Sequence, residues 1–150
     1  MKASNFTLPS TSQNNYSLKN SIGKYVVLYF YPKDDTPGCT IETNDFNKLL
    51  PKFKKLDCEI YGISKDSLKT HDKFRAKYKI KFNLLADEEI KVLKKYKVWG
   101  KKNFLGREFM GIIRTTFLID KKGKIIKIWE NVKVKEHAKE VMETLKNYQK

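Results

Sequence analysis

Hydrophobic residues follow two different periods along this chain. Residues 25–31 (YVVLYFY) form a continuous aromatic and β-branched run, which is typical of a buried central strand. Beyond Thr40 the period becomes that of one helix face, with hydrophobic residues at i, i+3, i+4 and i+7 from Phe46 to Phe53. Pro51 lies within this predicted helix, and we expect it to bend the helix near Asn47 because its ring clashes four residues back.

The middle of the chain continues the alternation of strand and helix. Residues 59–64 predict a second buried strand. Residues 66–78 predict a helix with Ser64 or Asp66 as its N-cap. Residues 82–85 predict a short third strand, after which Asp87 can cap a helix over residues 88–97.

The C-terminal part carries a hairpin signature. Residues 115–119 (TTFLI) and 125–129 (IIKIW) read as strands, and between them lies the turn sequence DKKG. Because this turn is too short for a crossover, the two strands must be antiparallel. Hydrophobic residues at helical spacing over residues 134–145 predict a terminal amphipathic helix.

The element order β-α-β-α-β-α-β-β-α indicates an α/β protein with a mixed central β-sheet flanked by helices. At 150 residues with 40% hydrophobic content, the chain fits a single domain with one core, so we assign residues 1–150 to one domain. The polar stretch 10–15 (STSQNN) reads as a surface loop inside that domain.

The composition argues against a membrane-spanning protein and against a secreted one. The longest apolar run has seven residues (25–31), far below the ~20 that a membrane-spanning helix needs. The first residues show no apolar signal-peptide core, so we expect no secretory signal. Two cysteines cannot form a disulfide framework, which favours a reducing compartment and a cytoplasmic protein.

The net charge of +15 raises the possibility of a nucleic-acid or membrane-surface partner. Arginine supplies the bidentate contacts that read phosphates and guanines, yet only Arg75, Arg107 and Arg114 are arginines. The lysines are scattered over every segment. A lysine-rich solvated surface is therefore favoured, with no specific nucleic acid and no membrane as partner. A basic nucleic-acid-associated binding protein stays open as the alternative function.

Cys39 is the candidate for chemistry. It follows a loop at the end of the first buried strand and lies where the next helix begins, and ligands of open α/β sheets bind at such ends. The helix dipole and unpaired N–H groups there favour the thiolate, which is the nucleophile. The alternative is an inert, buried cysteine. No C-x-x-C pair exists, which argues against a thioredoxin-type disulfide exchanger. Single-thiolate chemistry therefore remains open: peroxide reduction, acyl transfer or thiol transfer.

Two other kinds of site are disfavoured. A cysteine hydrolase needs a histidine base, but His71 and His137 both lie on predicted helices and read as surface or hydrogen-bonded residues. Two histidines and two dispersed cysteines offer no metal-ligand spacing. We expect neither a metal nor a cofactor.

The segment YPKDDTPGCT resembles the peroxiredoxin active-site signature, with Pro32, Thr36 and Cys39 at the signature spacing, and is similar to the Q-type subgroup, also called bacterioferritin comigratory proteins. The likeness extends from about Phe6 to Leu145. It continues through residues 62–64, 84–87, 96–100 and 111–120.

The resemblance implies a thioredoxin-like fold and a thiol peroxidase that reduces hydrogen peroxide and organic hydroperoxides. Carried over by position, Cys39 would be the peroxidatic cysteine, and Thr36 would hydrogen-bond the thiolate and the peroxide. Pro32 would shield the sulfur from water, and Arg114 would lean into the pocket from a later strand. A peroxide-sensing redox switch built on Cys39 is a second alternative function.

One departure from the subgroup concerns recycling. The positions where relatives carry a resolving cysteine hold Asn44 or lie near Phe74, and neither offers a thiol. Cys58 is expected at the opposite sheet edge from Cys39, out of disulfide range, with a packing role. We therefore expect a one-cysteine mechanism in a monomer, with thioredoxin, glutaredoxin or glutathione as the external reductant.

Overall fold

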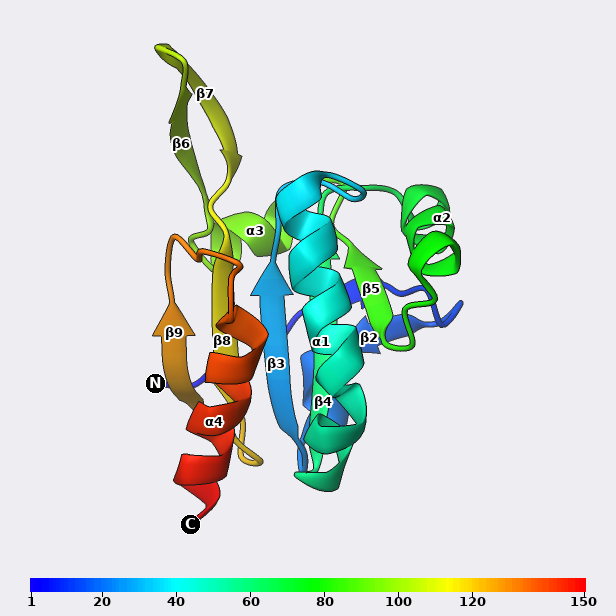
Figure 1. Cartoon of the computed structure of the whole chain (residues 1–150), viewed down its shortest axis with the longest axis vertical. Coiled ribbons are helices and arrows are strands. Elements are labelled where there is room, and N and C mark those ends of the chain that lie inside the picture. The colour runs from blue at the N-terminus through cyan, green and yellow to red at the C-terminus, as the bar shows by residue number, and fades with distance from the viewer.

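A five-stranded mixed sheet with the order β5-β4-β3-β8-β9 forms the centre of the computed structural model, which describes residues 1–150 (Figure 1). The parallel strands are β3 (Tyr25–Phe30), β4 (Cys58–Ser64) and β5 (Asn83–Ala86). The antiparallel strands β8 (Thr115–Ile119) and β9 (Ile125–Trp129) complete the sheet beside β3. The predicted α/β class and the mixed sheet are confirmed. The central strand predicted over residues 25–31 is also confirmed, as β3.

Both faces of the sheet are covered, which explains the continuous hydrophobic run in β3. Val27 and Tyr29 point into the core beneath α1 (Pro37–Lys55) and α4 (His137–Gln149). The intervening residues of β3 face a second core. That core is covered by β1 (Thr7–Pro9), β2 (Asn15–Ser17), the 3₁₀-helix η1 (Leu18–Ser21) and α3 (Lys91–Lys95).

Helix α1 begins in the loop that follows β3, just before Cys39, as predicted. Its first residue is Pro37, because Thr36 takes an extended N-cap conformation and proline is well suited to the first helical position. The helix continues through Pro51 to Lys55 without a break. The consequence is that Cys39 lies inside the first turn of the helix.

Three helix boundaries differ from the sequence prediction. The N-cap of α2 (Leu68–Tyr78) is Ser67, whose hydroxyl accepts from the Thr70 N–H; Ser64 and Asp66 bond to each other instead. Helix α3 is shorter than residues 88–97 because Ile90 adopts a left-handed conformation. Asp87 still accepts a hydrogen bond from the Leu93 N–H, as a cap would. Helix α4 starts at His137, three residues later than predicted, after a left-handed Glu136.

A second β-hairpin was not predicted. Strands β6 (Trp99–Phe104) and β7 (Arg107–Ile112) pair antiparallel and project beyond the sheet at the end where α1 begins (Figure 1). Most of its side chains are exposed, so its sequence lacks the alternation that marks a half-buried strand. The hairpin forms one wall of the site described below.

The two cysteines lie at opposite ends of the sheet, as predicted. In the parallel pair β3–β4, Cys58 is the register partner of Tyr25 at the beginning of both strands. Cys39 comes after the other end of β3, and the α1 helix separates the two residues. Both thiols are free and buried. None of the helices combines the length and the apolar composition that a membrane crossing requires.

Candidate active site

Cys39 and Arg114 meet at the carboxyl end of β3. Cys39 is fully buried in the first turn of α1, and Arg114 occupies the short link between β7 and β8. The guanidinium Nη2 donates a hydrogen bond to the Cys39 Sγ over 3.3 Å. A Cβ atom on Gly38 would lie 3.2 Å from Nη2, so the glycine leaves room for this approach. A fixed cation therefore faces the sulfur.

Glu42 is a third member of this group, and the sequence analysis missed it. It lies three residues after Cys39 on the same helix and is almost completely buried. Its Oε1 accepts from the Arg114 Nη1 over 2.7 Å, whereas its Oε2 has no hydrogen-bond partner. Burial raises the pKa of Glu42 to about 7, although the Arg114 charge pulls it down. The carboxyl group holds the guanidinium between itself and the sulfur.

Pro32 and Thr36 lie on the loop between β3 and α1, as predicted. Pro32 and Arg114 line the same surface cleft. The Thr36 hydroxyl donates to the Lys33 carbonyl over 2.8 Å and makes no capping bond to the helix. This leaves the hydroxyl oxygen as an acceptor at the start of α1. The structure thus brings Arg114 to Cys39 directly and keeps the other two residues on the adjoining loop.

A buried network anchors that loop. His71 on α2 contacts Asp34 through Nδ1 at 2.6 Å, and its Nε2 is 2.9 Å from the Leu85 carbonyl. A carbonyl only accepts, so Nε2 carries a proton. Tyr31 donates to the other oxygen of Asp34, and the Asp34 N–H donates to Asp66. These groups could by type hold a metal ion, but their polar atoms satisfy one another and tie the loop to α2 and β5.

Neither histidine hydrogen-bonds to Cys39. Besides His71, His137 is buried, with its Nε2 2.8 Å from the Thr116 hydroxyl. Burial lowers the pKa of His137 to about 4, so the ring is neutral near pH 7. The prediction of hydrogen-bonded histidines is confirmed, and the structure contains no cysteine–histidine pair of the kind a hydrolase uses.

Lys102 is a second residue that the sequence analysis missed. It extends from β6, and its Nζ donates to the Ile112 carbonyl over 2.9 Å. Burial lowers the pKa of Lys102, and the nearby Arg114 charge lowers it further. Only the unpredicted hairpin brings this lysine to the site, so no local sequence signal could have identified it.

Comparisons with known proteins agree with this geometry. The model of the AhpC/TSA family matches residues 1–128. The chain is 47% identical to Peroxiredoxin Bcp of Bacillus subtilis over 146 residues, which cover 97% of this chain and 93% of the relative. It is 41% identical to Peroxiredoxin Bcp of Xanthomonas campestris over 152 residues, covering 100% and 95% of the two chains.

Solved structures show the same fold. A mutant of PrxQ from Xylella fastidiosa superposes with a TM-score of 0.95 at 36% identity, covering 100% of this chain and 96% of that one. Peroxiredoxin Q from Xanthomonas campestris gives a TM-score of 0.92 at 41% identity, with 97% and 92% covered. The predicted thioredoxin-like fold is confirmed.

The Glu42 carboxyl should leave a signature in the pH dependence of stability. Folding raises its pKa from an ordinary value of 4.5 to about 7, so the folded state binds more protons between these pH values. The free energy of unfolding therefore falls as the pH rises through this range. Glutamine does not titrate. We therefore compare the free energies of unfolding of Glu42→Gln and of the unsubstituted protein, measured by urea denaturation. Between about pH 5 and about pH 8, the difference should change by on the order of 1–3 kcal/mol, with Glu42→Gln becoming relatively more stable.

Glu143→Gln, on the exposed side of α4, is the matched control and should show no such shift. A stability difference between Glu42→Gln and the unsubstituted protein that stays constant with pH would contradict the raised pKa.

Proposed function

The chain belongs to the AhpC/TSA family and, within it, to the peroxiredoxins of the Bcp or Q type, and we propose that Cys39 is the thiol with which it reduces peroxides. It is a thiol peroxidase. The observation that supports the choice of cysteine is the 3.3 Å contact between the Arg114 Nη2 and the Cys39 Sγ. The other cysteine has no cationic partner, and burial raises its pKa well above the ordinary value.

The first chemical step is a displacement at oxygen. The Cys39 thiolate attacks the nearer peroxide oxygen, an S–O bond forms, and the O–O bond breaks. The electron pair leaves with the farther oxygen as hydroxide or alkoxide, which then takes a proton. Sulfur is oxidised to a sulfenic acid and the peroxide is reduced to water or an alcohol.

The residues around the sulfur fit that step. Negative charge moves from sulfur towards the leaving oxygen, and a fixed donor along that line stabilises the transition state more than the ground state. Arg114 is the donor, and Glu42 holds it in place. The Thr36 oxygen accepts a hydrogen bond from the incoming peroxide, since its own proton is committed to Lys33. Pro32 limits the access of water.

Recycling uses an external thiol. An incoming thiol condenses with the sulfenic acid to a mixed disulfide and releases water; a second thiol then attacks this disulfide and frees Cys39. Thioredoxin, glutaredoxin or glutathione fits this role. Cys58 does not, because it lies at the far end of the sheet and beyond α1.

The substrates are hydrogen peroxide and organic hydroperoxides. For the latter, one solved relative at 40% identity is described by its alkyl peroxide reduction activity, the bacterioferritin comigratory protein of Xanthomonas campestris. All the site residues come from one chain, so a monomer suffices for the reaction. The two unpaired thiols fit a reducing compartment such as the cytoplasm. The comparisons do not favour the nucleic-acid-binding alternative.

Replacement of each cysteine by serine in turn separates the roles of the two thiols. Cys39→Ser should abolish peroxide consumption in the presence of a thiol donor, because serine is not ionised at neutral pH. Cys58→Ser should retain most of the activity. The measurement is hydrogen peroxide consumption with thioredoxin, glutaredoxin and glutathione supplied separately. An inactive Cys58→Ser beside an active Cys39→Ser would reverse the assignment.

Arg114→Ala should slow the oxidation of Cys39 by peroxide at least tenfold, because loss of one preorganised donor commonly costs about 10²–10³ in rate. Arg114→Lys should recover only part of the rate, since it keeps the charge but loses the second N–H that Glu42 holds. Stopped-flow oxidation of the reduced protein gives the rate. Arg107→Ala, on the exposed hairpin, is the control for a lost arginine. An unchanged rate for Arg114→Ala would remove this residue from the mechanism.

A further inference from the structure

The turn over residues 34–36, between β3 and α1, contains a strained residue close to Cys39. Asp35 has a φ of 60°, in the left-handed region that costs a non-glycine residue free energy. Thr36 follows as the extended N-cap of α1, and Pro37 is the first residue of the helix. Cys39 lies in the first turn of α1, so the course of these residues determines where its sulfur lies.

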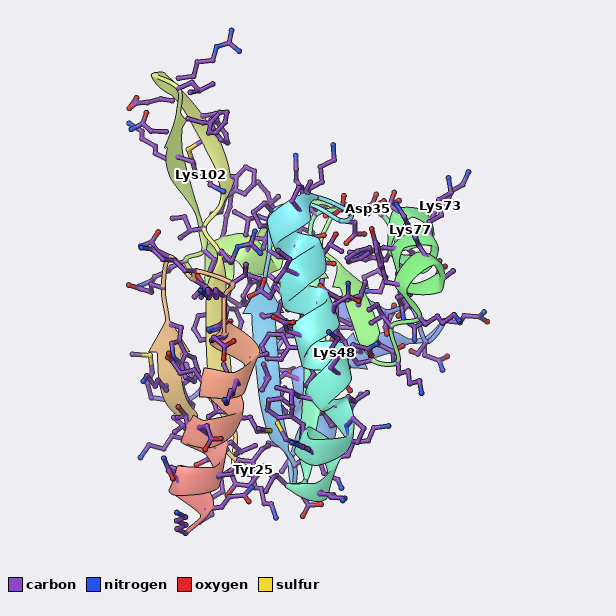
Figure 2. The ribbon with its side chains drawn as sticks, viewed as in Figure 1. Tyr25, Asp35, Lys48, Lys73, Lys77 and Lys102 are labelled. Carbon is purple, nitrogen blue, oxygen red and sulfur yellow. The ribbon has the colours of Figure 1, made fainter.

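Two contacts with α2 hold this turn. On the surface, Lys77 forms an ion pair with Asp35 over 2.7 Å, and the two side chains are 57% and 42% exposed. Figure 2 shows both residues at the end of the molecule where α1 begins. In the interior, the Asp34 carboxyl group meets the His71 Nδ1 at 2.6 Å, and both side chains are buried.

The two contacts differ in strength. An exposed ion pair contributes little to stability and is screened by salt. A buried polar group that loses its partner keeps the full cost of its desolvation, so a buried hydrogen bond is hard to break. The inner contact between His71 and Asp34 is therefore the one that fixes the turn.

The His71 ring has a fixed place because both of its nitrogens are bonded. Nε2 donates to the Leu85 carbonyl of β5, which leaves Nδ1 for Asp34. The Tyr31 hydroxyl donates to the other oxygen of Asp34. The carboxyl group is thus held from the end of β3 and from α2, and it cannot shift without the loss of a buried hydrogen bond.

This anchoring bears on the reaction because the Cys39 sulfur meets a group from another part of the fold. Arg114 comes from the link between β7 and β8 and contacts the sulfur over 3.3 Å. Without the anchor, Asp35 would relax and the first turn of α1 would open, which moves the sulfur relative to the guanidinium. A displacement of about 1 Å in such a site can lower a rate by about 10².

We propose that His71 is a positioning residue for peroxide reduction: through Asp34 it fixes the turn that places the Cys39 sulfur against Arg114. His71 itself makes no hydrogen bond to the sulfur. The inference rests on the proposed function, because it concerns the rate at which Cys39 reacts.

The first test compares two substitutions of His71 that each keep one of its hydrogen bonds. An asparagine amide lies near the position of Nδ1 and can still donate to Asp34, whereas a glutamine amide lies near Nε2 and keeps only the bond to Leu85. The rate of Cys39 oxidation by hydrogen peroxide in a single turnover is measured by quenched flow and mass spectrometry. His71→Gln should be at least about tenfold slower than the unsubstituted protein, and His71→Asn should stay within about threefold of it.

A double-variant cycle separates positioning from a general loss of structure. If His71 acts by placing the sulfur against Arg114, its substitution has little left to disturb once the guanidinium is gone. His71→Gln should therefore slow Arg114→Ala by less than about twofold. Tyr31→Phe loosens the same Asp34 carboxyl group by the loss of one hydroxyl. It should show a smaller slowing with the same dependence on Arg114, and it carries the test if His71→Gln does not fold.

Two control variants keep the active site intact. Lys77→Gln removes the exposed contact with Asp35 and should leave the rate within about twofold. Tyr16→Phe removes a buried hydroxyl that bonds to Ser21 on the other face of the sheet, and it matches Tyr31→Phe in every respect except position. It should also leave the rate unchanged.

The outcomes separate the positioning role from the proposed function. If hydrogen peroxide does not oxidise Cys39 in the unsubstituted protein, the proposed function fails. If it does, the role of His71 is overturned by an unchanged rate in His71→Gln, by His71→Asn being as slow as His71→Gln, or by an undiminished effect in the Arg114→Ala background. An equal slowing by Tyr16→Phe and Tyr31→Phe would also overturn it, because the rate would then follow stability alone.

Discussion

The Arg114 guanidinium lies between the Cys39 sulfur and the buried Glu42 carboxyl and donates a hydrogen bond to each. An unpaired charge in a protein interior is costly, so the ion pair with Glu42 fixes the position of the Arg114 guanidinium. Cys39 and Glu42 are three residues apart on one helix, and the arginine comes from the link into β8. The contact therefore requires α1 and the antiparallel half of the sheet to meet at one edge, and the order of the strands provides this.

The loop before α1 is held from the other side. The buried Asp34–His71 contact joins it to α2, and the Leu85 carbonyl joins the same histidine to β5. The parallel half of the sheet thus fixes the loop, while the antiparallel half supplies Arg114. Cys39 lies where the two meet, and the preorganisation that peroxide reduction needs follows from this arrangement.

Local patterns in the sequence predicted much of this architecture. Each of three elements could be predicted from a short, continuous segment of the sequence. They are β3 with its hydrophobic run, α1 with its helical spacing, and the hairpin of β8 and β9. Cys39 at a strand-to-helix junction was recognisable for the same reason. Glu42 and Lys102 were not, because Glu42 bonds to Arg114 across 72 positions of the chain and Lys102 reaches the site only on the unpredicted hairpin. The β6–β7 hairpin was missed because it packs on little and shows no periodic burial.

We propose that one thiol, that of Cys39, performs the oxidation and that the Cys58 thiol cannot reach it. Intact-protein mass spectrometry after one equivalent of hydrogen peroxide tests this directly, with dimedone present in a parallel sample. We expect the gain of one oxygen atom at Cys39, trapped as a dimedone adduct on the peptide that contains it, and the same product from Cys58→Ser. The loss of two hydrogen atoms within a monomer, mapped to a disulfide between Cys39 and Cys58, would contradict it.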